Sequence, residues 1–284
     1  MLSRILVPVR GDGMAETVVR HAAALAKEHK AHIVVAHCRT AATDFMPYSV
    51  PLPAFARDTI MSQAKELADQ QEQLVRDQLH ELAGSLALSE TDKPAPGIAS
   101  VELIEEMGPM ADVIKHHGRL ADLVVVAKPN RDTNLGVNSL KSGLFRTGRP
   151  VLMCPPEGKV PERFGSRIAV AWNGSLEASR AVATTLDLAA AAASVKILSG
   201  GRGEPRGATT EELVAYYDLR GIKAEIHRFE SGNPGAALLS KTAEVGADLL
   251  IMGAYGHNHE RETLFGGNTQ AVVDKAEIPV ILVH

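Results

Sequence analysis

An internal duplication constrains the fold of this chain more than any other feature of its sequence. Residues 4–11 match residues 167–174 at a shift of 167 − 4 = 163 positions, and residues 121–126 match residues 247–252 at a shift of 247 − 121 = 126. A chain that begins again in this way specifies the same structural unit twice. The difference between the shifts, 163 − 126 = 37, places an excess of about 37 residues inside the first copy.

Each copy is predicted to form a doubly wound parallel sheet. Short apolar runs are typical of buried strands, and apolar residues spaced three and four positions apart are typical of helices. In the first copy the predicted strands are residues 5–9, 33–36, 99–104, 123–127 and 150–154, and the predicted helices are residues 14–29, 54–86 and 110–117. Because crossovers between parallel strands are right-handed, this order favours an α/β fold with a five-stranded sheet in each copy. Such sheets bind ligands beyond the carboxyl ends of their strands, so the loops after the first and fourth strands are the predicted site.

Length and composition agree with two domains of this kind. The 284 residues suit a first domain over residues 1–154 with a long insertion at about 40–96, a linker over 155–166 and a second domain over 167–284. Hydrophobic residues make up 45% of the chain but aromatic residues only 4%, so Ala, Val, Ile and Leu must build the interior. That interior is typical of a parallel sheet covered by helices.

Charge and cysteine content exclude several classes of function. The formal net charge of −4 provides no general attraction to nucleic acid or anionic lipid, so neither is predicted as a partner. Cys38 and Cys154 are too isolated for a disulfide framework or a zinc site, and both are predicted to be buried in a reducing compartment. The chain enters its first strand without a signal sequence and holds no stretch as long as a membrane span, so we expect a cytoplasmic protein.

A glycine-rich loop follows the predicted strand at residues 249–252. Gly253 and Gly256 end that strand, a polar segment follows, and Gly266 and Gly267 come directly before a helical pattern. Backbone N–H groups at the start of a helix face outward and favour an anion, most often a phosphate.

The spacing of these glycines resembles the nucleotide signature of the universal stress protein family. That signature is Gly, two residues, Gly, nine residues, Gly and then Ser or Thr; Gly253, Gly256 and Gly266 match it, whereas Gly267 stands in place of the hydroxyl residue. The whole chain resembles a tandem universal stress protein, with two universal stress protein A domains. The resemblance implies two adenine nucleotide alpha hydrolase-like domains arranged as an intramolecular pseudo-dimer. It also implies ATP or another adenine nucleotide as ligand, with or without Mg²⁺.

The resemblance further implies which residues surround the nucleotide. Ala171, Trp172 and Asn173 would flank the adenine, and Met252 and Gly253 would contact the base or the ribose. The phosphates would lie against Gly256, Gly266, Gly267, Asn268 and Thr269. One phosphate contact is missing at Gly267, and Asn268 or Thr269 is expected to replace it.

The first copy departs from this signature at the equivalent loop. Ala127 and Asn130 replace the first two glycines, and their side chains would obstruct a close approach of phosphate to the backbone. Pro129 also removes an N–H group. We therefore predict that the first domain does not bind ATP in the manner of the family.

Catalysis and metal binding have weaker support in the sequence. His257 and His259, beside Glu260, suggest a metal site, but the sequence shows no third and fourth ligand. His257, His259 or Glu260 could also act as a base, but nothing in the sequence would position a water molecule. No catalytic residue and no metal site are therefore predicted. No Walker-type phosphate loop is present either.

The role predicted for the chain is binding and signalling in a stress response. A nucleotide-free interaction protein and a slow ATP hydrolase or phosphotransferase stay open as alternatives, as do a homodimer and an unidentified protein partner. The helix predicted at residues 54–86 would reach roughly 50 Å at about 1.5 Å per residue, so a break or an overhang is expected. Its apolar stripe is predicted to pack on the core and in the pseudo-dimer, with partner binding as the alternative.

Overall fold

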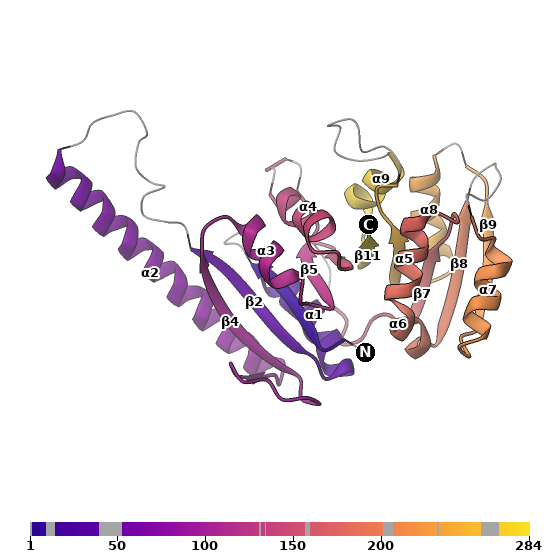
Figure 1. The fold of residues 1–284 in the computed structure, drawn as a ribbon, viewed down its shortest axis with the longest axis horizontal. Coiled ribbons are helices and arrows are strands. Elements are labelled where there is room, and N and C mark those ends of the chain that lie inside the picture. Colours follow the sequence, from indigo (N-terminus) through magenta and orange to yellow (C-terminus); the bar gives the residue numbers. More distant parts are fainter. Residues whose placement is uncertain are drawn as a thin grey trace.

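The fold is a single large sheet covered by helices on both faces (Figure 1). It is seen in a computed structural model that describes residues 2–9, 15–39, 53–130, 132–133, 135–156, 160–200, 207–231, 233–256 and 267–284. The first half of the chain forms β1 (Arg4–Val9), α1 (Ala15–His29), β2 (His32–Arg39), α2 (Ala54–Ser85), β3 (Ser89–Glu90), β4 (Ser100–Met107), α3 (Met110–Gly118), β5 (Leu123–Ala127), α4 (Val137–Arg146) and β6 (Val151–Cys154). The second half forms β7 (Arg167–Ala171), α5 (Leu176–Thr184), α6 (Leu186–Ala191), β8 (Ser194–Gly200), α7 (Thr210–Asp218), β9 (Ala224–Phe229), α8 (Pro234–Glu244), β10 (Leu249–Gly253), α9 (Gly267–Lys275) and β11 (Val280–Val283).

The strand order confirms the predicted doubly wound α/β topology in both halves. Along the sheet the strands run β3-β4-β2-β1-β5-β6-β11-β10-β7-β8-β9. The order β4-β2-β1-β5-β6 of the first half is therefore repeated as β9-β8-β7-β10-β11 in the second. Neighbours within each half are parallel, whereas β6 and β11 pair antiparallel and join the halves edge to edge. The first half has one strand more than predicted, because the two-residue β3, which lies within the predicted insertion, pairs with β4.

Two apolar layers hold the helices to the sheet, one on each face. Alternate residues of β1 face opposite sides, so that Ile5 and Val7 belong to one layer and Leu6 to the other. The first layer packs against α1, the end of α2, α5 and α7, and the second packs against α3, α4, α8 and α9. Each layer contains residues of both halves, so the cores of the two copies are continuous.

In each half, one aspartate accepts hydrogen bonds from backbone N–H groups at the start of the first strand. The Asp122 carboxylate accepts hydrogen bonds from the N–H groups of Ser3 and Arg4, at 2.7 and 3.0 Å. Asp248 accepts in the same way from Gly165 and Arg167, at 2.9 and 3.0 Å. The matched segments of the sequence therefore have matched contacts.

Of the break or overhang expected for the long helix α2, the overhang occurs: the helix is continuous and extends beyond the sheet at one end (Figure 1). Leu79 and Ala83 are buried near its carboxyl end, whereas Leu67 and Leu74 are 58% and 60% exposed. The prediction that its apolar stripe packs on the core is therefore confirmed near the carboxyl end of the helix and wrong for Leu67 and Leu74, which are exposed to solvent.

The two cysteines are free, but only one is fully buried. Cys154 lies in the core, where burial raises the pKa of its thiol, and Cys38 is half-buried with its sulfur 3.5 Å from that of Met110. Within the described part of the chain, no helix is both long enough and apolar enough to cross a membrane.

Candidate functional site

The candidate site lies where the strand order of the second half reverses. There β7 and β10 are adjacent and parallel, with Ala171 opposite Met252 at their carboxyl ends. The loop after β7 leads into α5, and the loop after β10 leads toward α9. The structure thus brings together the two loops that the sequence predicted to meet.

The loop after β7 is a compact turn. The Asn173 side-chain oxygen accepts a hydrogen bond from the N–H of Ser175, whose hydroxyl in turn accepts from Ala178 at 3.2 Å and caps α5. Gly174 has a φ of +71°, and a Cβ there would lie 2.9 Å from the Gly207 nitrogen, so only glycine fits.

Of the three residues expected near the adenine, only Asn173 is exposed. Ala171 is half-buried. Trp172 is 7% exposed, and its indole N–H donates to the carbonyl of Ala208 at 3.0 Å. The ring of Trp172 therefore anchors this turn to the segment before α7 and offers little open surface to a base.

The first two glycines of the signature lie directly against α5. A Cβ on Gly253 would be 2.5 Å from the Ala178 nitrogen, and one on Gly256 would be 2.8 Å from Oε2 of Glu177. These positions exclude a side chain because strand and helix approach each other closely. Met252 is buried, so it can reach a ligand through its backbone but not through an exposed side chain.

Glu177 is a candidate residue that the sequence interpretation missed. It lies in the first turn of α5 and is only 7% exposed, and Oε2 is buried without a hydrogen-bond partner among the described residues. A sequence signal was present: Glu177 precedes the buried Ala181 by one helical turn, so the helical period places a carboxylate on the apolar face.

Tyr255 ties the loop after β10 to the first half of the chain. Its φ is +63°, and its ring centroid lies 5.3 Å from that of Phe145 at the end of α4. Phe145 also contacts the ring of His284 at 4.8 Å, and a ring nitrogen of His284 lies 3.2 Å from the Ala254 carbonyl. Burial raises the pKa of the Tyr255 hydroxyl above its usual range.

The start of α9 offers an exposed helix amino terminus. Gly267 and Asn268 are exposed, whereas Thr269 is 7% exposed. A Cβ on Gly267 would meet nothing within 4 Å. Gly266 and the alternative metal or base candidates His257, His259 and Glu260 lie outside the described residues.

The equivalent loop of the first half uses its backbone donors internally. The N–H groups of Lys128 and Asn130 donate to the carbonyls of Cys154 and Leu135, at 2.8 and 3.0 Å. The Asn130 side chain accepts from Asp132 and Thr133. The ammonium group of Lys128 reaches into the second half and donates to the Ala276 carbonyl at 3.0 Å, next to the end of α9. These contacts support the prediction that this loop does not bind phosphate.

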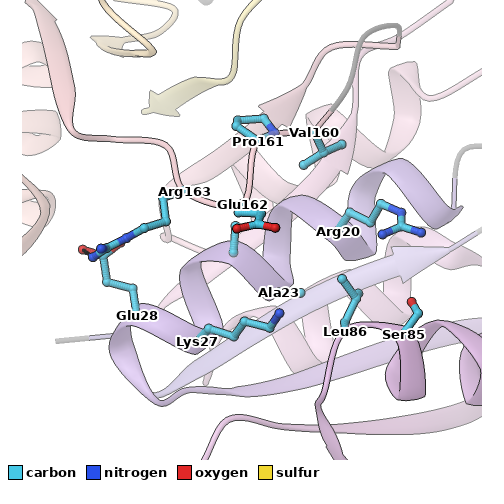
Figure 2. A pocket seen from close by; sticks show the side chains of 11 residues that line it. Arg20, Ala23, Lys27, Glu28, Ser85, Leu86, Val160, Pro161, Glu162 and Arg163 are labelled. Carbon is cyan, nitrogen blue, oxygen red and sulfur yellow. Dashed lines mark ion pairs between the residues drawn. The ribbon is translucent and has the colours of Figure 1, made fainter.

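A separate pocket of about 680 Å³ lies between α1, the end of α2 and residues 160–163 (Figure 2). Arg163 pairs with Glu28 at 3.5 Å, and Arg20 pairs with Glu16 at 2.8 Å, so two of its cationic groups already have partners. None of the candidate site residues lines it. Among the described residues, no cluster of three or more His, Cys, Asp or Glu side chains could hold a metal ion.

Fold and site together define a doubly wound α/β protein with a glycine loop at the switch point of its second half. The universal stress protein family model matches residues 1–137 and 166–284. The chain therefore belongs to the universal stress protein family, and its two matched segments make it a tandem member.

Solved structures of low sequence identity share the fold over the whole chain. A universal stress protein from Archaeoglobus fulgidus DSM 4304 is 18% identical with a TM-score of 0.72, and the match covers 99% of this chain and 95% of that one. A functionally unknown protein from Pseudomonas aeruginosa PAO1 is 16% identical with a TM-score of 0.54, covering 99% and 92%. The comparison with curated proteins found no match.

Proposed function

We propose that the second half of the chain binds ATP or a related adenine nucleotide, as a binding and signalling component of a stress response. The observation that carries this proposal is the convergence of three features at one sheet edge. The exposed amino terminus of α9, Gly253 and Gly256 at the end of β10, and the turn after β7 all lie beyond the carboxyl ends of the strands. In doubly wound sheets that edge is where nucleotides bind.

The start of α9 supplies the anion-binding part of this proposal. Gly267 and Asn268 are exposed there, and the first N–H groups of a helix have no partner within the helix. The helix dipole adds a partial positive charge at the same end. A phosphate bound at Gly267, with the nucleoside toward Asn173, would span the site.

We further propose that the chain binds one nucleotide rather than two. In the first half the loop donors of Lys128 and Asn130 already have partners, so the first domain, residues 1–154, would keep only the fold. The second domain, residues 167–284, would hold the ligand.

Isothermal titration with ATP in the presence of Mg²⁺ tests the proposal. We expect one site per chain in the wild type and a loss of binding in Gly256→Val, whose side chain would collide with the carboxylate of Glu177. The control is Gly84→Val, since Gly84 lies on α2 with open space around it, and its binding should equal that of the wild type. If the wild type released no heat, nucleotide binding would be refuted; if Gly256→Val bound normally, the site would be misplaced.

Exposed apolar residues along α2 favour a second candidate function, a nucleotide-free interaction protein. Phe55, Leu67 and Leu74 are 74%, 58% and 60% exposed on one helix. Exposed apolar surface of this kind is typical of partner binding. An absence of nucleotide binding in the titration would leave this function as the better account.

A further inference from the structure

Glu177 places a negative charge inside the site proposed for an anionic ligand. Its Oε2 atom lies 2.8 Å from the point where a Cβ of Gly256 would stand, so the carboxylate lies directly beside the second glycine of the loop. The side chain is 7% exposed, and that oxygen has no hydrogen-bond partner in the part of the chain that the structure describes. A buried and unpartnered carboxylate is costly, so its position calls for a ligand.

The surroundings of Glu177 offset only part of the cost of burying its negative charge. The carboxylate lies in the first turn of α5, where the helix dipole favours an anion. A nucleotide phosphate at the glycine loop would add a second negative charge nearby, and two like charges at short range repel each other in a partly buried site. A phosphate bound in the proposed site would therefore be opposed by the carboxylate of Glu177.

We propose that Glu177 makes nucleotide binding in the second half depend on a divalent cation, which the carboxylate and the phosphates bind together. This inference rests on the proposed function. The orphaned oxygen of Glu177 is a hard ligand of the kind that Mg²⁺ prefers. Mg²⁺ is commonly held by one or two carboxylates together with phosphate oxygens and water. No protein cage is needed for that arrangement, which agrees with the absence of a metal-binding cluster among the described residues.

The competing assignment for Glu177 is a hydrogen bond to the ribose hydroxyls. Gly253, expected near the base or the ribose, also contacts the backbone of Glu177, so the two assignments have to be separated by experiment. The two assignments differ in whether binding depends on the phosphates and on a cation. A ribose contact acts on adenosine and ATP alike and needs no cation, whereas a cation contact requires phosphates.

Calorimetric titration of the full chain with ATP, in Mg²⁺ or in EDTA, tests the inference. We expect the wild type to lose at least tenfold in affinity when Mg²⁺ is removed. We expect Glu177→Gln to change less than threefold between the two conditions and to bind metal-free ATP more tightly than the wild type does. Glu277→Gln is the matched control: it removes one negative charge from an exposed position beyond the far end of α9 and should behave as the wild type.

Three further measurements test the inference. Glu177→Asp retains the charge, so it should retain the dependence on Mg²⁺; thermal melts of all variants without ligand establish that each is folded. Adenosine, which has no phosphate, should bind wild type and Glu177→Gln equally. A loss of adenosine binding in Glu177→Gln would assign the carboxylate to the ribose and overturn the cation assignment.

The outcomes separate this inference from the proposed function. Equal binding of ATP by the wild type in Mg²⁺ and in EDTA would overturn the cation role and leave nucleotide binding standing. The same would follow if Glu177→Gln kept the full dependence on Mg²⁺. If the wild type bound no adenine nucleotide in either condition, the proposed function would fail and this inference with it.

Discussion

Gly267 occupies the family's hydroxyl position without any steric need for glycine. A Cβ there would meet nothing within 4 Å, in contrast to Gly253 and Gly256, where a Cβ would approach α5 to less than 3 Å. Gly253 and Gly256 therefore have a packing role in the free protein, whereas Gly267 does not. The departure from the family signature is thus a local loss of one polar group at an otherwise open helix start.

Gly267→Ser should restore that group and tighten ATP binding. A hydroxyl that donates to a charged phosphate contributes about 1.5 kcal/mol or more, so we expect an affinity increase of about tenfold. Titration calorimetry of the variant against the wild type measures it. Gly267→Ala is the control, because it adds the Cβ without the hydroxyl. Equal gains from Ser and Ala would show that helix stabilisation, and not phosphate contact, is the cause.

At the scale of elements, a charged cluster docks α2 on the carboxyl ends of β2 and β4. Arg39 of β2 pairs with Asp69 and, at 2.9 Å, with Glu72 of α2. Glu105 of β4 lies 3.9 Å from both Arg76 of α2 and His37 of β2. Burial and a hydrogen bond with Glu72 raise the pKa of Glu105 to about 7, so below that pH Glu105 is protonated and can donate to Glu72.

This cluster predicts a pH-dependent stability that Glu105→Gln should remove. Because the pKa of Glu105 is raised on folding, the folded state holds more protons than the unfolded state between pH 4.5 and about 7. The free energy of unfolding then falls as pH rises through that window. Relative to the wild type, Glu105→Gln should therefore gain on the order of 2 kcal/mol between pH 4.5 and pH 8. Urea denaturation at both pH values measures it.

Glu72 and His37 contact Glu105, so their own contributions change with the substitution, whereas groups that do not contact Glu105 are the same in both proteins and drop out of that comparison. Burial lowers the pKa of His37, which gives the opposite trend, a stability that rises with pH up to about 6.5. The control is Glu81→Gln, an exposed position on the same helix, which should differ from the wild type equally at the two pH values. A parallel pH dependence of Glu105→Gln and wild type would contradict the raised pKa of Glu105.

Most of the sheet could be predicted from the sequence, because strands buried on both faces are continuous apolar runs. The runs at Ile5 and Leu123 predicted their strands for that reason. The two-residue β3 has no such run, and its pairing depends only on the neighbouring β4. Helical periodicity predicted α2 but not how far it projects from the sheet, since that depends on what lies beneath each turn.

The sequence predicted where the candidate site lies on the sheet, but not which side chains are buried within it. The glycine loop and the turn after β7 follow from the strand order. The burial of Trp172 depends on the Ala208 carbonyl, which is distant in sequence. The position of the Glu177 carboxylate likewise depends on how closely β10 approaches α5. Contacts of this kind arise from tertiary packing, on which local patterns carry no information.

At the scale of the whole molecule, the first half supports the loop of the second. Phe145 of α4 packs against Tyr255 within the glycine loop, and Lys128 donates to the end of α9. These contacts lie beside the antiparallel junction, where Leu152 pairs with Ile281. The half that is predicted not to bind nucleotide thus contacts the loop and helix of the half that is proposed to bind it.

Removal of the Phe145 ring should expose Tyr255 and lower the pKa of its hydroxyl. Burial is the main cause of the raised value, so Phe145→Ala should bring it toward the usual value of about 10. Absorbance titration near 295 nm measures this, and a Phe145→Ala/Tyr255→Phe double variant identifies the signal. Phe55→Ala, on the exposed part of α2, is the control. An unchanged titration would show that Phe145 does not shield the loop.

The antiparallel junction between β6 and β11 also bears on how two such copies can diverge. In a pair of identical chains every substitution appears twice, so a lysine that serves one side of the interface must be tolerated on the other. Covalent fusion removes that constraint, and the linked copy is always present at a high effective concentration. Lys128 and Phe145 can therefore specialise in contacts to their neighbour, while mutations that would abolish binding in a symmetric pair accumulate in one copy only.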